Sequence, residues 1–371
     1  MHQLMTQPAE IADRKVQPSE PCAGPLFVVG MFRSGTSLLY ALLNQHPQIA
    51  LMYEGDLAHL PSLFWLPTNT RRWLARWEFW NGSLSRHKVD LSEIPEGISD
   101  LKTAFHEVYV QYAQQKKSAT VWGCKSPTYS DQVSRLARIF PNARFIIIWR
   151  DLRGICRSIR KAAEKPSFFR RTGVTLRTLI GYRELKAQCD EIKSQGVPIH
   201  QMHYEDLVAD PTGTMQGICE FLQIPFDPQM ASLEGADRSA IENAAHHSLV
   251  KTEKIIASET SASDLPPALK EKIDRYLYLW HEQNGGSWPV YPRVMEATTR
   301  PSLGEQVLDR ARYKCLQLWY HGAPVAFSFV PLRLWKAYRK LMGRPYAREL
   351  DYRIGTRTSG TEPVHKTRTR T

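Results

Sequence analysis

The stretch of residues 25–56 constrains the fold of this chain more than any other. It begins with an apolar run of strand length, residues 26–29, and continues into a turn bracketed by Gly30 and Gly35. Leucine and alanine then recur at helical spacing as far as His46-Pro47. This order of strand, turn and helix predicts a cradle for a phosphate group, because the glycines let successive N–H groups and the helix N-terminus point at an anion.

The turn departs from the usual nucleotide-binding pattern at one position. Its spacing fits G-x-x-x-x-G-K-S/T, but Thr36 stands where that pattern has its lysine. The cation of the turn is Arg33, which comes earlier. This exchange favours a bound phosphate ester over a standard nucleoside-triphosphate hydrolase.

The positive charge of the chain is concentrated near its C-terminus. Residues 301–371 hold 14 lysines and arginines against 5 acidic residues, a net of +9, whereas residues 1–300 hold 35 against 32, a net of +3. A nucleic-acid-binding function read from the overall charge of +12 would therefore be misleading for the body of the protein. We expect no nucleic-acid partner.

The N-terminal sequence and the cysteines bear on the cellular compartment. Residues 1–20 are polar and lack the apolar segment of a secretory signal. The 6 cysteines are scattered without C-x-x-C spacing, which suits free thiols in a reducing compartment. We therefore expect a cytoplasmic protein.

Strand-like and helix-like segments alternate along the body of the chain, which predicts an α/β fold. We expect a P-loop-like, three-layer arrangement with a central, mostly parallel sheet. Glu54, Lys125, Arg150 and Tyr204 each stand at the carboxyl end of a predicted strand, where such sheets bind ligands. The predicted strands are 26–29, 48–53, one beginning at 121, 144–149 and 199–204, and the predicted helices include 131–140, 176–195, 212–222 and one that follows Asp151.

The same pattern divides the chain into one main domain with additions. We expect the main domain at 25–295, with a Trp-rich helical cap at 61–117 inserted between strands. The cap either borders an acceptor site or packs its own small core. The additions are a flexible arm at 1–24, a basic and apolar helical extension at 296–355 and a disordered tail at 356–371.

Three segments together resemble the sulfotransferases that use 3′-phosphoadenosine 5′-phosphosulfate (PAPS), and most of all the protein-tyrosine sulfotransferases and related bacterial enzymes. The first resembles the loop for the 5′-phosphosulfate, its helix and a catalytic glutamate; the second resembles the 3′-phosphate motif; the third resembles a tyrosine that contacts the nucleotide. The first segment is 33–39 with His46-Pro47 and Glu54. The second is 124–127 and 136–145 with Arg150-Asp151 and Ser158, and the third is 204–207 with Phe221-Leu222.

The resemblance implies sulfuryl transfer from PAPS to an acceptor hydroxyl. Glu54 would act as the base, since it ends a strand beside the phosphate loop, and Arg33 and Lys125 would stabilise charge in the transition state. Ser248 resembles a serine of the family that helps to stabilise the transition state. The residues expected to bind PAPS are Arg33, Ser34, Gly35, Thr36, Ser37, Arg150, Ser158 and Tyr204. Such a site needs no metal, because its cations are side chains.

The sequence also departs from the tyrosine sulfotransferases. Ala162 replaces a basic residue near the 3′-phosphate, and residues 56–60 lack the arginines that grip acidic peptides. The acceptor therefore stays open between a sugar, a lipid, a small alcohol and a tyrosine.

Several competing interpretations remain open at this point. Glu54 could form a structural ion pair with Arg33, and Lys125 could be a solvated loop lysine. Ser158 and Tyr204 could serve only in packing. As a whole, the chain could instead be a P-loop kinase or NTPase in which Asp151 holds a metal ion, or a nucleic-acid-binding protein that uses its basic tail.

The extension contains an uncharged stretch, residues 315–332, between basic flanks. Its histidine, glycine and two prolines make it a poor transmembrane helix. Two alternatives stay open for residues 301–343: a peripheral membrane contact, and a helical pair docked on the body or on a partner chain, which would include a homo-oligomer.

Overall fold

The computed structural model describes residues 24–55, 57, 87–90, 94, 101–116, 119–164, 174–242, 252–255, 265–283, 300–328, 334 and 337. The predictions made for residues 1–23, for most of the cap, for Ser248 and for the tail beyond 337 lie outside these residues.

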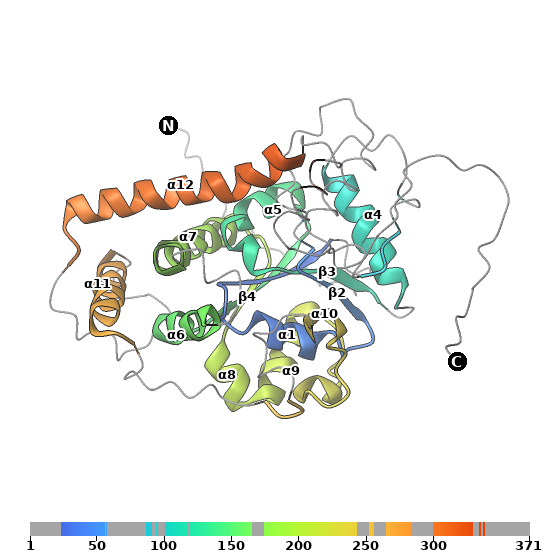
Figure 1. The fold of residues 1–371 in the computed structure, drawn as a ribbon. Coiled ribbons are helices and arrows are strands. Elements are labelled where there is room, and N and C mark those ends of the chain that lie inside the picture. The colour runs from blue at the N-terminus through green and yellow to red at the C-terminus, as the bar shows by residue number, and fades with distance from the viewer. Residues whose placement is uncertain are drawn as a thin grey trace, which may run out of the picture.

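A sheet of parallel strands forms the centre of the molecule, as the alternating pattern predicts (Figure 1). The strand order is β2-β3-β1-β4-β5, so the strand that leads into the phosphate loop is the central one. Its residues are all buried, which explains the unbroken apolar run that marks it in the sequence. The strands are β1 (Leu26–Gly30), β2 (Ile49–Tyr53), β3 (Val121–Lys125), β4 (Arg144–Trp149) and β5 (Ile199–His203).

Helices cover both faces of the sheet and give the three layers expected for an α/β fold. The helices are α1 (Thr36–Leu43), α4 (Leu101–Gln114), α5 (Val133–Ile139), α6 (Leu152–Ala163), α7 (Val174–Ser194), α8 (Tyr204–Ala209), α9 (Pro211–Leu222), α10 (Ser239–Glu242), α11 (Pro267–Gln283) and α12 (Leu303–Ser328), with short 3-10 turns η3 (Pro127–Asp131) and η5 (Pro228–Ala231). The P-loop-like fold class is therefore confirmed.

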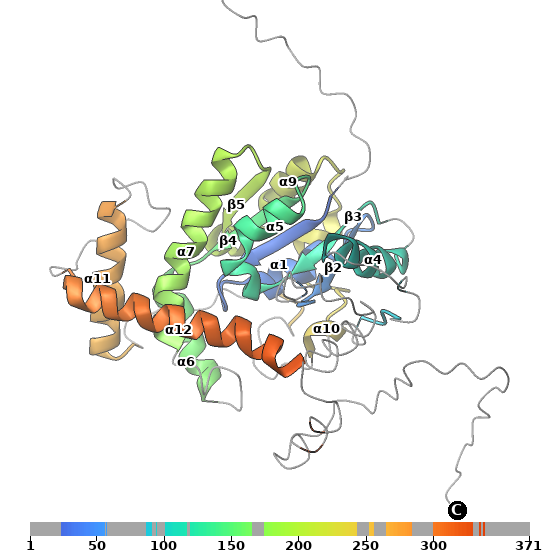
Figure 2. The ribbon, with the colours of Figure 1, turned by 90° about the horizontal axis from the view of Figure 1, so that it is seen from above.

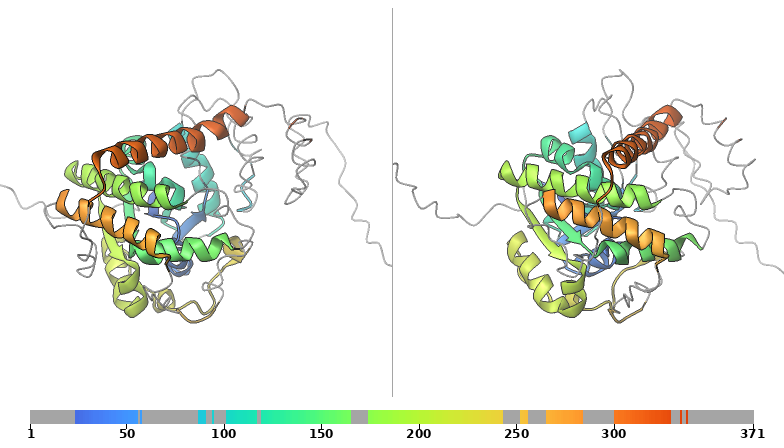
Figure 3. Two further views of the ribbon diagram at one scale, coloured as in Figure 1. Left: turned by 60° about the vertical axis from the view of Figure 1, so that its left-hand side comes forward. Right: turned by 90° about the vertical axis from the view of Figure 1, so that its left-hand side faces the viewer.

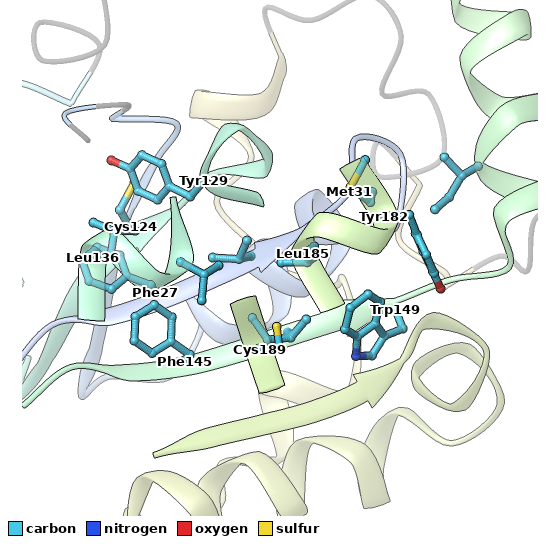
Figure 4. Close-up of a cluster of buried hydrophobic side chains, with 14 of the residues drawn as sticks. Phe27, Met31, Cys124, Tyr129, Leu136, Phe145, Trp149, Tyr182, Leu185 and Cys189 are labelled. Atoms are coloured by element: carbon cyan, nitrogen blue, oxygen red, sulfur yellow. The ribbon is translucent and has the colours of Figure 1, made fainter. Parts of the chain in front are cut away.

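Two separate hydrophobic cores lie on the two faces of the sheet. Phe27 and Val29 of β1 point into the core formed with α4, α5, α6 and α7, part of which is shown in Figure 4. Leu26 and Val28 point to the other side, into the core formed with α1, α8 and α9. This alternation follows from the two-residue period of a strand. It fixes which face of β1 each helix covers.

The structure differs from the sequence-based prediction at two element boundaries. The strand predicted at 199–204 ends at His203, and Tyr204 is the first residue of α8. Glu205 and Asp206 in the first turn of α8 favour a helix start at this point, since acidic groups stabilise a helix N-terminus. The helix predicted at 131–140 begins only at Val133, as α5, because Asp131 is the last residue of η3 and the backbone of Gln132 between them is not helical.

In the C-terminal extension the structure describes one long helix, α12, up to residue 328, and the rest of the segment for which a helical pair is one alternative lies outside the described residues apart from residues 334 and 337. α12 runs along the outside of the molecule beside α7, with α11 near its N-terminal end (Figures 1 and 3). Among the described residues, no helix combines the length and the apolarity that crossing a membrane would require.

Candidate active site

The carboxyl ends of four parallel strands bring the predicted site residues to one edge of the sheet. Glu54 directly follows β2, Lys125 ends β3, Arg150 directly follows β4 and Tyr204 directly follows β5. Between β2 and β5 lies β1, which delivers the loop that contains Arg33. The sheet order therefore places residues from distant parts of the sequence around one loop.

The loop at residues 31–35 is bent by two left-handed residues. Arg33 has a φ of 70° and Gly35 a φ of 102°. A side chain at Gly35 would also place its Cβ 2.5 Å from Cδ2 of Tyr204, so glycine is needed there for two independent reasons. Ser34 is fully buried, and its hydroxyl oxygen has no hydrogen-bond partner within the described residues. The N-terminus of α1 follows directly at Thr36, and its N-cap residue, Gly35, provides no side-chain cap.

Two arginines from different motifs meet at this loop. The Nη1 atom of Arg150 donates a hydrogen bond to the carbonyl oxygen of Arg33 at 2.9 Å, and the Nε atom of Arg33 donates one to Oγ of Ser158 at 3.0 Å. Burial lowers the pKa of both arginines, and for Arg33 the charge of Arg150 lowers it further. Two neighbouring cations, of which Arg150 is buried and Arg33 is half-buried, favour a bound anion.

Arg150 has hydrogen-bond capacity that the described protein atoms do not use. Its side chain is 5% exposed, and its Nε and Nη2 atoms are buried without a partner in the described part of the chain. The guanidinium carbon lies 4.1 Å from the ring centroid of Tyr204, so one face is covered by an aromatic ring. A buried N–H group without an acceptor is costly. The site therefore has the donors that a phosphate oxygen would satisfy.

The backbone around Arg150 is held by groups of the protein itself. Tyr182 of α7 donates its hydroxyl hydrogen to the Arg150 carbonyl at 3.1 Å. Asp151 accepts hydrogen bonds from the backbone N–H groups of Arg153 and Gly154, at 3.3 and 3.1 Å, and so caps α6. The carboxylate that a kinase would use to hold a metal ion is therefore engaged at a helix N-terminus.

Glu54 and Lys125 form an ion pair on the other side of the loop. The Lys125 Nζ atom lies 2.9 Å from Oε1 of Glu54 and 3.4 Å from the ring centroid of Tyr53. The Lys125 side chain is fully buried, whereas the Glu54 side chain is 33% exposed. The interpretation of Lys125 as a solvated lysine is wrong, and the carboxylate of Glu54 is paired with Lys125.

The electrostatics of this pair keep the lysine charged. Burial alone lowers the pKa of Lys125, but the carboxylate of Glu54 and the phenol of Tyr53 outweigh it, so that the pKa is raised. Ser37 of α1 lies 3.4 Å from Nζ through its hydroxyl oxygen, which links the pair to the phosphate loop. A fixed ammonium group thus stands between the candidate base and the N-terminus of α1.

Two residues that the sequence-based prediction missed support this arrangement. The hydroxyl groups of Tyr53 and Ser37 are hydrogen-bonded at 3.0 Å. The Nε2 atom of the buried His87 lies 2.9 Å from the carbonyl oxygen of Tyr53 and 3.1 Å from its nitrogen. Tyr53 could have been suspected because it precedes Glu54 at a strand end. His87 lies in the cap, where no local pattern indicates it.

The remaining predicted residues are placed as follows. Thr36 and Ser37 are buried in the first turn of α1, Ser158 lies on α6 against Arg33, and Ser248 is outside the described residues. Within the described residues, no group of three or more histidine, cysteine or acidic side chains is arranged to hold a metal ion.

Three relatives that comparison with known proteins finds are all named as sulfotransferases. The chain is 29% identical to protein-tyrosine sulfotransferase 1 of Danio rerio over 210 residues, which cover 54% of each protein. It is 24% identical to a putative protein-tyrosine sulfotransferase of Caenorhabditis briggsae, over 67% of this chain and 78% of the relative. It is 26% identical to an omega-hydroxy-beta-dihydromenaquinone-9 sulfotransferase of Mycobacterium bovis, over 48% of this chain and 46% of the relative.

The chain spans about half the length of most of these curated relatives. Among solved structures, the sulfotransferase domain from the curacin biosynthetic pathway aligns with a TM-score of 0.45 and 19% identity, over 68% of this chain and 97% of that domain. The model of the sulfotransferase family matches residues 25–228, which include both arginine motifs, the candidate base and the tyrosine of α8. This chain therefore belongs to the sulfotransferase family.

Proposed function

We propose that this protein transfers a sulfuryl group from PAPS to a hydroxyl group of an acceptor. The observation that carries the proposal is the junction of the two arginine motifs. Arg150 carries two buried donors without a partner in the described residues, and its third nitrogen holds the carbonyl of Arg33 in the phosphate loop. Two adjoining anion sites of this kind suit one ligand that carries a phosphate group at each end of a nucleoside.

The two ends of such a donor would be held by different elements. The backbone N–H groups of residues 35–37, with the hydroxyl groups of Thr36 and Ser37, would hold the 5′ end at the N-terminus of α1, whereas the N–H of Ser34 is bonded to the Met31 carbonyl at 3.0 Å. Arg150 and Ser158 would hold the 3′-phosphate, at the end of β4 and on α6. The ring of Tyr204 covers the guanidinium of Arg150 and keeps water from it.

Glu54 has the position that a general base requires. It stands next to the loop, and its exposure of 33% leaves it within reach of an acceptor. In the reaction, a bond forms between the acceptor oxygen and sulfur, and the bond between sulfur and the phosphate oxygen breaks. Glu54 takes the proton of the acceptor hydroxyl, while Lys125 and Arg33 neutralise charge on the sulfuryl and leaving oxygens. The donor itself supplies the activated sulfuryl group.

The acceptor class is a hydroxyl compound rather than an amine or a thiol in this proposal. The relatives are named for protein tyrosine and for an omega-hydroxylated menaquinone, both of which carry a hydroxyl group. A carboxylate base and a buried ammonium group serve either acceptor equally well. The cytoplasmic location expected from the sequence belongs to the same proposal.

A kinase or NTPase is the less favoured alternative. The loop has Thr36 in place of the usual lysine, and Asp151 caps α6. A thermal-shift experiment distinguishes the two functions. We expect 3′-phosphoadenosine 5′-phosphate to raise the Tm of the protein much more than ATP does. A shift of equal size with ATP would contradict the proposed donor.

Transfer itself is tested by incubating the protein with radiolabelled PAPS and a host extract, and by identifying the labelled product. A product that is labelled only with intact Glu54 supports the proposal. Label that appears equally with a Glu54→Gln variant contradicts the role given to this residue.

A further inference from the structure

Several large apolar side chains of α12 point away from the protein, whereas Tyr313 of the same helix is buried. Within the described residues, the large hydrophobic side chains that are exposed to solvent are confined to this helix and to Leu334 beyond it. Their exposed fractions are 80% for Leu303, 67% for Val307, 50% for Leu308 and 73% for Leu318. Figures 2 and 3 show α12 lying along the outside of the body, beside α7. A surface helix normally turns its apolar side to the core, so this orientation needs an explanation.

The inward side of α12 combines the buried ring of Tyr313 with polar contacts to α11. Asp309 accepts a hydrogen bond from the hydroxyl of Tyr276 on α11, and Lys272 lies 3.3 Å from the same carboxylate. Arg275 pairs with Glu305 at 3.0 Å. These contacts tie the helix to α11 through the buried Asp309 and the exposed Glu305. The orientation of α12 is therefore fixed, with its apolar side outward.

The outward apolar residues form one continuous stripe. Residues 304, 307, 308, 311, 315 and 318 are all exposed and are spaced so that they lie on a single helical face. We define this set as the outer stripe of α12. It is made of Gly304, Val307, Leu308, Ala311, Cys315 and Leu318.

Basic side chains border the outer stripe on both sides. Arg310 and Lys314, four residues apart, lie along one border, and Arg312, whose Nη1 atom lies 3.7 Å from Oδ1 of Asp309, lies along the other; all three are exposed. The acidic groups of the same helix, Glu305 and Asp309, are engaged with α11. The outward surface thus combines an apolar centre with positive flanks.

We propose that the outer stripe of α12 binds the surface of an anionic lipid bilayer, with the helix lying in the plane of the interface. An apolar face several residues long, flanked by basic side chains, is the pattern by which helices bind such surfaces. Charge complementarity favours an anionic lipid surface over a second copy of this chain as the partner of the stripe. A second copy of this chain would bring Arg310, Arg312 and Lys314 against the same residues, whereas anionic headgroups neutralise them. The inference does not depend on the proposed reaction.

Flotation of the full-length protein with lipid vesicles tests this surface. We expect binding to vesicles of phosphatidylcholine with phosphatidylglycerol and none to phosphatidylcholine alone. Added salt should weaken the binding, because it screens exposed charges. The double variant Val307→Asp with Leu318→Asp should lose binding at least about tenfold, since it removes apolar area from the stripe.

A charge-matched pair of variants separates the helix from the overall charge. Arg310→Glu with Lys314→Glu should weaken binding by at least about 25-fold, at about fivefold for each basic residue lost. Lys193→Glu with Lys254→Glu makes the same charge change at exposed positions outside α12 and should weaken binding much less. Circular dichroism and thermal unfolding of each variant check that it is folded.

Three outcomes would overturn the inference. One is equal binding of the wild-type protein to neutral and anionic vesicles, or to neither. Another is anionic binding that both α12 variants retain in full, which would assign it to another part of the chain. The third is a dimer, seen by analytical ultracentrifugation, that Val307→Asp with Leu318→Asp dissociates while vesicles are not bound, which would make a second copy the occupant.

Discussion

Nη1 of Arg150 donates a hydrogen bond to the backbone carbonyl oxygen of Arg33 at 2.9 Å, across 117 positions of sequence. Arg33 is in the left-handed backbone region, so the bond holds a strained residue of the loop in place. The residue that would bind the 3′-phosphate therefore also shapes the pocket for the 5′ end. One side chain would thus couple the two proposed pockets.

The Arg150→Ala substitution should weaken binding of 3′-phosphoadenosine 5′-phosphate by about 10- to 100-fold, because charge-assisted hydrogen bonds contribute about 1.5–3 kcal/mol. Isothermal titration calorimetry measures this change. Arg138→Ala, at an exposed position on α5, is the control and should leave the affinity unchanged. Unaltered affinity in Arg150→Ala would remove the basis for the second anion pocket.

The Gly35→Ala substitution should destabilise the protein more than Gly196→Ala does. Both glycines have a positive φ, so alanine costs about 1–2 kcal/mol of backbone strain at either position. Only at Gly35 would the new Cβ collide with Tyr204; around Gly196 nothing lies within 4 Å. Urea denaturation gives the two free energies of unfolding. Equal losses at the two sites would mean that Tyr204 moves aside freely.

The Glu54→Gln substitution should lower kcat by about 10²- to 10⁴-fold while binding of the donor product is retained, because only the proton acceptor is removed. Single-turnover transfer assays and calorimetry measure the two quantities separately. Parallel loss of donor binding and of kcat would instead assign Glu54 a structural role with Lys125.

The Lys125→Met substitution should lower the free energy of unfolding by about 1–3 kcal/mol, a range kept below that of a fully buried ion pair because Glu54 is partly exposed. The pKa of Lys125 is raised in the folded protein, so the charged side chain stabilises the fold fully at pH values below its pKa in the unfolded chain. This stabilisation is lost as the pH rises through the pKa of Lys125 in the folded protein. The difference between wild type and variant should stay constant from about pH 6 to 9 and shrink only above about pH 10.5. Urea titrations over this pH range provide the measurement.

The His87→Ala substitution should lower kcat by about 10- to 100-fold and change the KM for the donor little. His87 contacts the backbone of Tyr53, and Tyr53 directly precedes the candidate base, so its loss should misplace that base without removing a donor contact. His87→Gln keeps a donor and an acceptor and should restore much of the activity. Failure of glutamine to restore kcat, with an equal loss in both variants, would contradict a positioning role.

Much of the fold follows from local patterns that the sequence displays. The five strands were predicted within one or two residues, because buried parallel strands are short apolar runs that turns interrupt. The strand that should have ended at Tyr204 stops one residue earlier, since the acidic first turn of α8 competes for that residue. Glu54, Lys125, Arg150 and Tyr204 were predicted as site residues because they stand at predicted strand ends, which lie together in a parallel sheet, and Arg33 was predicted as the cation of the loop.

The sequence by itself determined the alternation of strands and helices, the bent phosphate loop and the set of charged residues at the strand ends. Only the tertiary structure decided which of these charges meet: Lys125 with Glu54, and Arg150 with the carbonyl of Arg33. It alone brought His87 to Tyr53 and turned the apolar side of α12 outward. The physical reason is that local propensity acts over a few residues, whereas strand order and helix orientation depend on how distant segments pack.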